Sequence, residues 1–293
     1  MKLLSLSNPE KSDIQFKVSK FPDGQQSVSI EVDSLVVNGQ YLTDDHIVIE
    51  SRFNSFRDLE LIISANQALK EMGIPAIDLV VPYFLGARSD RKFTEGTSNY
   101  LKTVVCPIIN SQNFNQVVVL DPHSDVLEAC LNNFTKVDNV QLVNFALEKI
   151  GRDNVVLVSP DAGALKKVYH VAESLELSDI VIASKHRDVT TGKITHTEVP
   201  GIDKYGENHK FVIVDDICDG GRTFTELAKA IRQHNALSEI YLIVTHGIFS
   251  AGMKPLNDVF TGIFTTNSIR SIEDETFNSA NDTTQLHIQQ ILL

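Results

Sequence analysis

Two adjacent acids followed by a pair of glycines are the residues of this sequence best suited to chemistry. An apolar run at residues 211–214 leads into Asp215 and Asp216, and glycines at 220–221 precede a helical pattern over residues 223–234. Glycines let backbone N–H groups converge on an anion, and a helix start adds partial positive charge. Acids bind phosphate poorly but accept hydrogen bonds from vicinal hydroxyls. The segment predicts a sugar-phosphate site, although alone it could also be a tight strand-to-helix turn.

The elements that would position these residues are those of an α/β protein. Short apolar runs alternate with helical patterns, which is typical of a mostly parallel sheet. Six runs end in polar or charged residues: 77–84, 117–120, 155–158, 180–183, 211–214 and 240–244. Because ligands of open α/β sheets bind beyond the carboxyl ends of the strands, we expect one functional rim. The clearest helix should begin at Asn54 and Ser55, which can cap it, and stop at Gly73.

The two halves of the chain have a similar plan, which predicts two domains. We expect an N-terminal domain over residues 1–148 and a C-terminal domain over 149–275 that carries the glycine pair. The tail, residues 276–293, should pack back on one of them as a strand.

Composition and charge limit the class of protein. The 293 residues are 42% hydrophobic and 22% charged, with a net charge of -12. An acidic chain is not expected to bind nucleic acid, which requires a basic surface. The start is too polar for a signal peptide, and no apolar run approaches the roughly 20 residues of a membrane helix. Three scattered cysteines, Cys106, Cys130 and Cys218, fit reduced thiols, so we expect a cytoplasmic protein without membrane contacts.

The acid and glycine segment resembles the ribose-phosphate loop of type I phosphoribosyltransferases and of ribose-phosphate diphosphokinases. Their loop usually reads as two acids, two apolar residues and then Asp-Thr-Gly/Ala-Gly-Thr. The resemblance implies that Asp215 and Asp216 hold the ribose 2- and 3-hydroxyls. It also implies that the 5-phosphate is held by Asp219, Gly220, Gly221, Arg222 and Thr223.

Further motifs favour the diphosphokinase branch, and the resemblance covers most of the chain. Residues 21–25, Phe-Pro-Asp-Gly-Gln, are similar to the family's Phe-Ser-Asp-Gly-Glu, which reads adenine from a neighbouring subunit. Residues 82–92 are similar to its Pro-Tyr-Phe…Ala-Arg-Gln-Asp-Arg-Lys, which binds ATP. The implied ATP-binding residues are Phe21, Asp23, Gln25, Arg88, Ser89, Asp90, Lys92 and His123.

Four shorter motifs complete the resemblance. Asp-Pro-His at 121–123 and Ser-Pro-Asp-Ala-Gly at 159–163 are similar to motifs whose His and Asp help position magnesium, which implies a metal site at His123 and Asp161. Lys-His-Arg at 185–187 is similar to the basic pair of a mobile catalytic loop, and Thr-His-Gly-Ile-Phe-Ser at 245–250 to a segment near the sugar. The implied catalytic residues are Lys185 and Arg187. Taken alone, Asp161 could equally be a helix cap, and Lys185 and Arg187 could be the solvated edge of a strand. The order of the motifs along the chain favours the functional roles.

The resemblance implies two similar type I phosphoribosyltransferase-like domains, each a mostly parallel sheet flanked by helices. It implies transfer of diphosphate from Mg-ATP to the anomeric 1-hydroxyl of ribose 5-phosphate, giving phosphoribosyl diphosphate and AMP. Mg²⁺ would be the cofactor, ATP the co-substrate, and the assembly a homo-oligomer, either dimer or hexamer, that serves nucleotide biosynthesis. The alternatives are a phosphoribosyltransferase and a non-catalytic regulatory homologue, which should have lost His123, Asp161, Lys185 or Arg187.

The ribose-phosphate loop departs from the family pattern at Arg222. The usual Thr hydroxyl is lost, and a guanidinium enters the nest of N–H groups. Arg222 could clamp a 5-phosphate, or grip a diphosphate diester whose far end leaves the pocket. A larger ribose 5-phosphate derivative such as ADP-ribose is therefore a second possible acceptor. Smaller departures are Gln25 for Glu, Ser89 for Gln and Pro122 for Leu.

Replacing Lys185 or Arg187 with Ala should lower turnover about a hundredfold or more, because each would remove one stabiliser of the charge on the leaving AMP oxygen. The measurement is the steady-state rate of AMP release from Mg-ATP. Near-wild-type turnover in either variant would reject the catalytic role.

Overall fold

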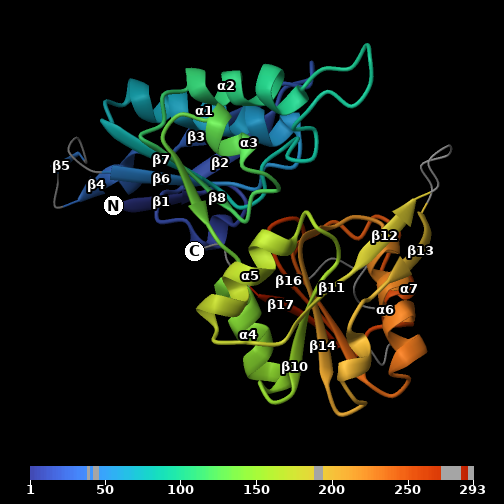
Figure 1. Ribbon diagram of the computed structural model, residues 1–293. Helices are drawn as coiled ribbons and strands as arrows, with labels where there is room; N and C mark the ends of the chain where they lie inside the picture. Colours follow the sequence, from blue (N-terminus) through green and yellow to red (C-terminus); the bar gives the residue numbers. More distant parts are fainter. Residues whose placement is uncertain (38–39, 42–45, 188–193, 272–284, 290–293) are drawn as a thin grey trace. The chain divides into compact units, whose positions relative to one another are not determined.

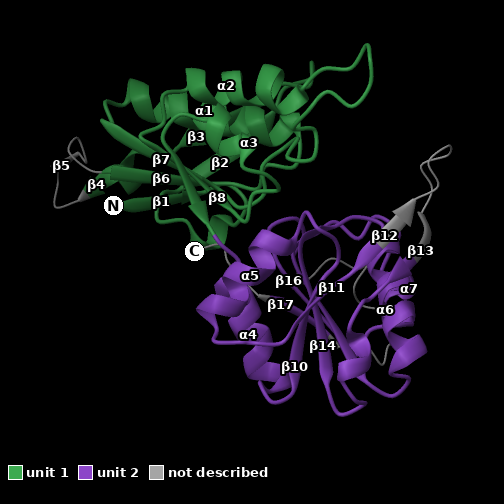
Figure 2. Ribbon diagram, in the orientation of Figure 1, with its two compact units in different colours: residues 1–137, 292–293 green, residues 138–291 purple. Residues whose placement is uncertain are grey.

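The computed structural model describes residues 1–37, 40–41, 46–187, 194–271 and 285–289 of the chain. Within these ranges the side chains of residues 37, 40, 41, 185–187, 194–196, 285 and 289 are not described. The chain forms two compact units that divide between Val137 and Asp138 (Figure 2). This division lies N-terminal to the boundary expected after residue 148, because helix α4 (Val140–Ile150) packs on the second sheet.

The first unit is built on a five-stranded parallel sheet with the order β1-β6-β7-β8-β9 (Figure 1). Its strands are β1 (Lys2–Ser5), β6 (His46–Glu50), β7 (Ala76–Val81), β8 (Gln116–Leu120) and β9 (Phe134–Val137). Three helices connect successive strands from β6 onwards: α1 (Phe56–Glu71), α2 (Cys106–Ser111) and α3 (Val126–Cys130). Two antiparallel ribbons lie between β1 and β6 in the chain: β2 (Phe16–Lys20) with β3 (Gln26–Ile30), and β4 (Val36–Val37) with β5 (Gln40–Tyr41).

Helix α1 confirms the helix expected from the sequence. The Ser55 hydroxyl accepts a hydrogen bond from the Asp58 N–H, and the Asp58 carboxylate accepts one from the Ser55 N–H. This reciprocal pair satisfies two N–H groups that have no partner within the helix. Gly73 follows the helix with φ of +83°, a conformation that glycine adopts without strain.

The second unit is built on a six-stranded parallel sheet with the order β11-β10-β14-β15-β16-β17. Its strands are β10 (Val155–Ser159), β11 (Ile180–Ile182), β14 (Lys210–Cys218), β15 (Glu239–Gly247), β16 (Gly262–Thr266) and β17 (Gln285–Gln289). The helices that follow α4 are α5 (Leu165–Ser174), α6 (Arg222–His234) and α7 (Lys254–Asn257). An antiparallel ribbon of β12 (Ser184–Arg187) and β13 (Ile194–Glu198) lies between β11 and β14 in the chain. The short helical segments of both units are η1 (Pro9–Lys11), η2 (Val32–Leu35), η3 (Leu101–Val105) and η4 (Ile202–Lys204).

The second sheet is covered by helices on both faces, as Figure 1 shows. Val212 and Val214 of β14 belong to a core shared with α4 and α5. Phe211 and Ile213 belong to the core shared with α6. Successive side chains of a strand point to opposite faces, so the apolar run buries both of its sides. The predicted α/β class with parallel sheets flanked by helices is confirmed.

The six polar strand ends do not all lie on one sheet. The runs at 77–84 and 117–120 end in β7 and β8 of the first unit, and the other four belong to the second sheet. Each unit therefore has its own set of polar strand ends. Strand β17, which lies within the tail, pairs in parallel with β16.

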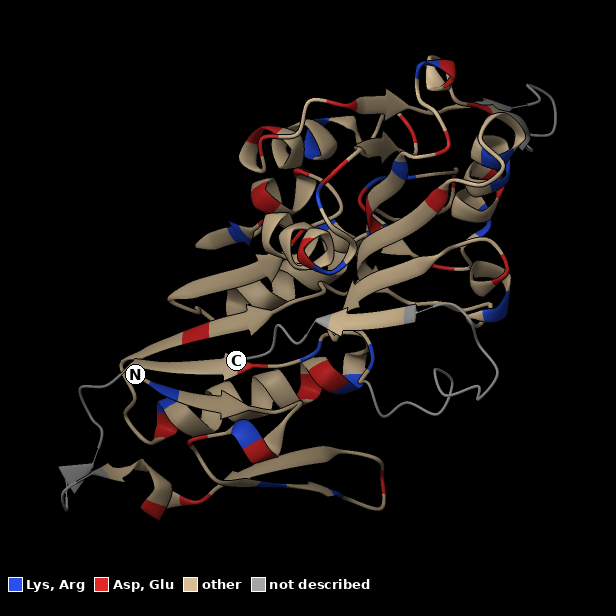
Figure 3. Ribbon diagram, turned by 90° about the horizontal axis from the view of Figure 1, so that it is seen from below, with Lys and Arg blue, Asp and Glu red and all other residues tan. Residues whose placement is uncertain are grey.

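Charged residues of both signs are interspersed along both units (Figure 3). In the part of the chain that the structure describes, no helix combines the length and apolar character that crossing a bilayer requires.

Truncating the buried Leu242 to Ala should lower the free energy of unfolding by about 2–5 kcal/mol, because it leaves a cavity at the centre of the second sheet. Leu237→Ala is the matched control, since Leu237 is 77% exposed and should cost no more than about 0.5 kcal/mol. Urea unfolding followed by circular dichroism measures both. Equal losses for the two variants would contradict the assignment of this core.

Candidate functional site

The acid pair lies where the strand order of the second sheet reverses. From β10 the chain crosses to β11 on one side, and from β14 it continues to β15 on the other. Ligands of open α/β sheets bind at such a switch point, beyond the carboxyl ends of the strands. Asp161 follows β10, and Asp215 and Asp216 lie in the last part of β14. The structure thus brings Asp161 near two adjacent acids that lie more than fifty residues later in the sequence.

The loop after β14 is held by the segment that follows β15. The Cys218 carbonyl accepts hydrogen bonds from the N–H groups of Ile248 and Phe249, at 2.9 and 3.1 Å. The Asp219 carbonyl accepts one from the Ser250 N–H at 3.1 Å, and the Ser250 hydroxyl donates to the Asp219 carboxylate at 2.5 Å. The motif at 245–250 therefore braces the glycine loop.

Gly221 is the residue that lets this loop enter helix α6. Its φ is +77°, and a Cβ atom there would lie 2.8 Å from Cδ2 of Leu256. A side chain at this position would be strained in the backbone and would also clash. At Gly220 a Cβ atom would meet nothing closer than 3.7 Å, which is ordinary contact. The loop conformation therefore requires a glycine at position 221 more strictly than at position 220.

The two adjacent acids have different surroundings. Asp216 is buried, and its Oδ2 accepts a hydrogen bond from the Lys167 ammonium of α5 at 2.7 Å. Asp215 is partly exposed by surface area, and its Oδ1 accepts one from the Asp216 N–H at 2.9 Å. Burial and the carboxylates of Asp216 and Asp161 raise the pKa of Asp215 well above its usual range, while Lys167 opposes that rise. Lys167 is thus a cation that offsets this acidic cluster.

Asp161 sits in the turn that opens α5. Its Oδ1 accepts hydrogen bonds from the N–H groups of Gly163 and Ala164, at 2.9 and 3.2 Å, and so closes the turn before the helix, whose N-cap residue is Ala164. A carboxylate oriented in this way is also the kind of oxygen ligand that Mg²⁺ prefers. Among the described residues, no three His, Cys, Asp or Glu side chains gather as a metal site.

Arg222 and Thr223 occupy the first turn of α6. Arg222 is exposed, and its guanidinium makes no hydrogen bond or ion pair with the described residues. Thr223 is partly buried. An unengaged guanidinium at a helix N-terminus can add charge and two parallel donors to an anion site.

The predicted adenine motif forms the turn of the β2–β3 ribbon in the first unit. Phe21 is 51% exposed, and Asp23 and Gln25 are also exposed. The turn is closed by a hydrogen bond from the Phe21 N–H to the Gln25 carbonyl at 2.8 Å. An exposed aromatic ring fixed by a turn is available to stack on a planar group.

The second predicted ATP segment follows β7. Arg88 and Lys92 are exposed and Ser89 is partly exposed, whereas Asp90 is buried and bound to the Nε of Arg91 at 3.0 Å. Burial would raise the pKa of Asp90, but Ser124, Arg91 and the charge of His123 together lower it. The segments after β7 and β8 therefore meet, which brings His123 close to Asp90.

Lys185 and Arg187 lie on strand β12, and their side chains lie outside the described part of the structure. The backbone of β12 pairs antiparallel with β13. The catalytic role expected for this pair remains a prediction.

Two further residues of this region were not among the predicted site residues. Lys167 lies on the side of α5 that carries the buried Val168 and Val171, and a lysine at such a position could have been noticed. The bond from Ser250 to Asp219 joins two motifs that sequence reasoning had treated separately.

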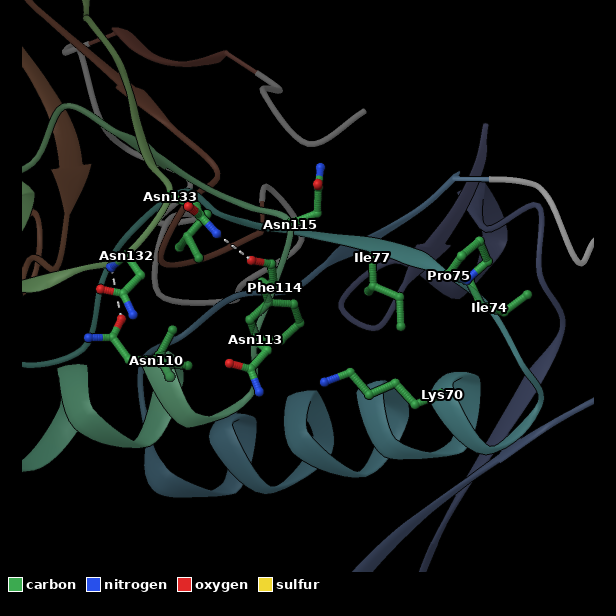
Figure 4. Close-up of a pocket in the computed structure, with 12 residues that line it drawn as sticks. Lys70, Ile74, Pro75, Ile77, Asn110, Asn113, Phe114, Asn115, Asn132 and Asn133 are labelled. Carbon is green, nitrogen blue, oxygen red and sulfur yellow. Dashed lines mark hydrogen bonds between the residues drawn. The ribbon is translucent and has the colours of Figure 1, made fainter.

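A pocket of about 280 Å³ in the first unit was also missed (Figure 4). It lies at the amino ends of β7, β8 and β9, whereas the predicted ATP residues follow the carboxyl ends of β7 and β8. The amides of Asn110, Asn115 and Asn133 in its wall donate hydrogen bonds within the unit. This pocket is therefore separate from the predicted ATP residues.

Gly221→Ala should destabilise the protein by about 1–3 kcal/mol, because it forces an L-residue into a positive φ against Leu256. Gly220→Ala should change the free energy of unfolding by less than about 1 kcal/mol, because the added methyl makes only ordinary contacts. Thermal and urea unfolding of the two variants measure this difference. The loop geometry would be wrong if the order of the two losses were reversed.

Comparison with known proteins supports the arrangement described above. The family model of the phosphoribosyl transferase domain matches residues 136–276, which cover most of the second unit. A ribose-phosphate pyrophosphokinase of Marinomonas sp. is 29% identical over 238 residues, 80% of this chain and 71% of the relative. The enzyme of that name from Vibrio parahaemolyticus is 29% identical over 259 residues, 86% of this chain and 78% of the relative.

A solved structure shares the fold of the whole chain. The phosphoribosylpyrophosphate synthetase of Mycobacterium smegmatis superposes with a TM-score of 0.77 at 17% identity, covering 100% of this chain and 95% of the other. Both units are thus matched by relatives of one kind. The chain is therefore similar over both units to ribose-phosphate pyrophosphokinases, and these relatives support an enzyme of this kind.

Proposed function

We propose that this enzyme transfers diphosphate from Mg-ATP to the anomeric hydroxyl of a ribose 5-phosphate unit, with release of AMP. Free ribose 5-phosphate is the leading acceptor. One observation carries the proposal: β14 delivers Asp215 and Asp216 to the switch point of the sheet, directly before a glycine loop at the start of α6. Carboxylates suit the hydroxyls at one end of a phosphorylated pentose, and the neighbouring N–H groups suit the phosphate at its other end.

The acceptor would lie along this segment. Asp215 and Asp216 would accept hydrogen bonds from the 2- and 3-hydroxyls of the ribose. The 5-phosphate would rest on the loop of Asp219, Gly220, Gly221, Arg222 and Thr223. The network that braces this loop through Ser250 keeps its N–H groups in place before the substrate arrives, which lowers the entropy lost on binding.

The first unit would supply the nucleotide contacts. The exposed ring of Phe21 could stack on adenine, with Asp23 and Gln25 reading its edge. Arg88 and Lys92 are exposed cations suited to the triphosphate. Ser89, the buried Asp90 and the neighbouring His123 would shape the same segment.

Magnesium would be held by His123 and Asp161, directly or through water, together with oxygens of the triphosphate. When bound, it would neutralise phosphate charge and align the transferred group. Lys185 and Arg187 would stabilise the charge that develops on the leaving AMP oxygen. The sugar's anomeric oxygen would attack the β-phosphorus, and the bond from that phosphorus to the AMP oxygen would break. Alignment and charge neutralisation account for most of such catalysis.

A second acceptor class is favoured by Arg222. This guanidinium stands beside the phosphate loop, exposed and without a bond to the described residues, where the family has a small residue. It could engage a second phosphate of a ribose 5-phosphate derivative such as ADP-ribose. The alternative of a phosphoribosyltransferase is opposed by the relatives, which match the first unit as well as the second.

Incubating the enzyme with Mg-ATP and either ribose 5-phosphate or ADP-ribose, and measuring AMP and product mass, tests the proposal. We expect AMP release that depends on the acceptor, and a product heavier than the acceptor by one diphosphate.

If Arg222 serves a second phosphate, Arg222→Ala should lower kcat/KM for ADP-ribose roughly tenfold or more while changing that for ribose 5-phosphate less. Lys229→Ala, on the exposed face of the same helix, is the control. Absence of AMP with every acceptor would reject the proposal, and AMP with ribose 5-phosphate alone would reject the second class.

A further inference from the structure

The Lys167 ammonium donates a hydrogen bond to Oδ2 of the Asp216 carboxylate at 2.7 Å. Both ends of this ion pair are largely shielded from water, with side-chain exposures of 19% for Lys167 and 7% for Asp216. A charge-assisted hydrogen bond in such surroundings is stronger and more directional than one at the surface.

The pair follows from the alternation of side chains along β14. Val212 and Val214 face the core shared with α4 and α5, and Asp216 is the next residue on that side of the strand. Lys167 comes from α5, whose Val168 and Val171 pack in the same core. The helix that begins in the Asp161 turn is thus tied to the strand that ends in the acid pair.

The fixed carboxylate stands in a crowded acidic region. Asp215 is its direct neighbour and binds its N–H, and Asp161 is near enough to act on Asp215 through its charge. A phosphorylated acceptor would add further negative charge. Removing the Lys167 ammonium would take away a positive charge that offsets this repulsion and a hydrogen bond that orients the Asp216 side chain.

We infer that Lys167 is a positioning residue for the acceptor: its ammonium holds one oxygen of Asp216, so that the other carboxylate oxygen is presented to a sugar hydroxyl. Lys167 itself does not contact the acceptor and acts through Asp216. This inference rests on the proposed function, because it takes Asp216 to be a hydroxyl ligand. It assigns to the acceptor site a residue of α5 that lies outside the ribose-phosphate loop.

Steady-state kinetics of Lys167→Met, with acceptor and ATP varied separately, provide the test. The KM for the acceptor should rise roughly tenfold or more, in line with losing one charge-assisted hydrogen bond, while the KM for ATP stays within about twofold. Lys167→Arg keeps a cation and should stay within about threefold of wild type for both. Lys166→Met is the matched control, since Lys166 is exposed and adjacent in the same helix. If Lys167→Met does not fold, Lys167→Gln carries the test, because its amide remains polar without the charge.

A double-mutant cycle with Asp216→Asn separates positioning from general destabilisation. If Lys167 acts through Asp216, adding Lys167→Met to Asp216→Asn should raise the acceptor KM no further. The inference would be overturned by additive effects in the double mutant, by equal changes in both KM values, or by an unchanged acceptor KM in Lys167→Met. None of these outcomes would affect the proposed function as long as the wild-type enzyme releases AMP. If wild type released no AMP with any acceptor, the proposed function would fail, and this inference with it.

Discussion

Two carboxylates at the end of a buried parallel strand are the constraint on which the second unit depends. Asp215 and Asp216 follow four apolar residues that are buried on both faces of β14. The packing of the sheet's centre therefore fixes the position of their backbone. Their carboxyl groups lie a few residues before a glycine loop and helix start, which attract the negative charge of a phosphate. A ligand with hydroxyls at one end and a phosphate at the other satisfies both halves of this arrangement.

The rest of the unit supports that arrangement from two sides. From β10 and α5 come the Asp161 turn and Lys167, which bring a cation to the buried acid. From β15 come the N–H groups of Ile248, Phe249 and Ser250, which hold the loop carbonyls. Gly221 completes the loop by adopting a backbone conformation that a side chain would strain against Leu256. The site is therefore made rigid by residues outside the acid and glycine segment itself.

Much of the fold could be predicted from the sequence, because its signals are local. The helix after Ser55 and the apolar runs that became β10, β14 and β15 appear where spacing and capping residues place them. The division of these runs between two sheets could not be predicted, because apolar runs indicate strands without indicating which sheet each one joins. The helical pattern over α4 likewise gives no sign that it packs on the second sheet.

The site was predictable where its parts are consecutive in sequence and less so where they are brought together by folding. Residues 215–223 form one segment, so their proximity is evident, whereas Lys167 meets Asp216 only because both face the same core. The resemblance to the family identified motifs of both units, but the bond from Ser250 to Asp219 required the three-dimensional structure.

The central claim is that the acceptor lies across the end of β14, and a crystal structure of the enzyme with acceptor and a non-reactive Mg-ATP analogue tests it most directly. The account predicts the pentose hydroxyls on the carboxylates of Asp215 and Asp216 and the phosphate on the N–H groups of the glycine loop. A sugar bound elsewhere, with this loop empty, would contradict it.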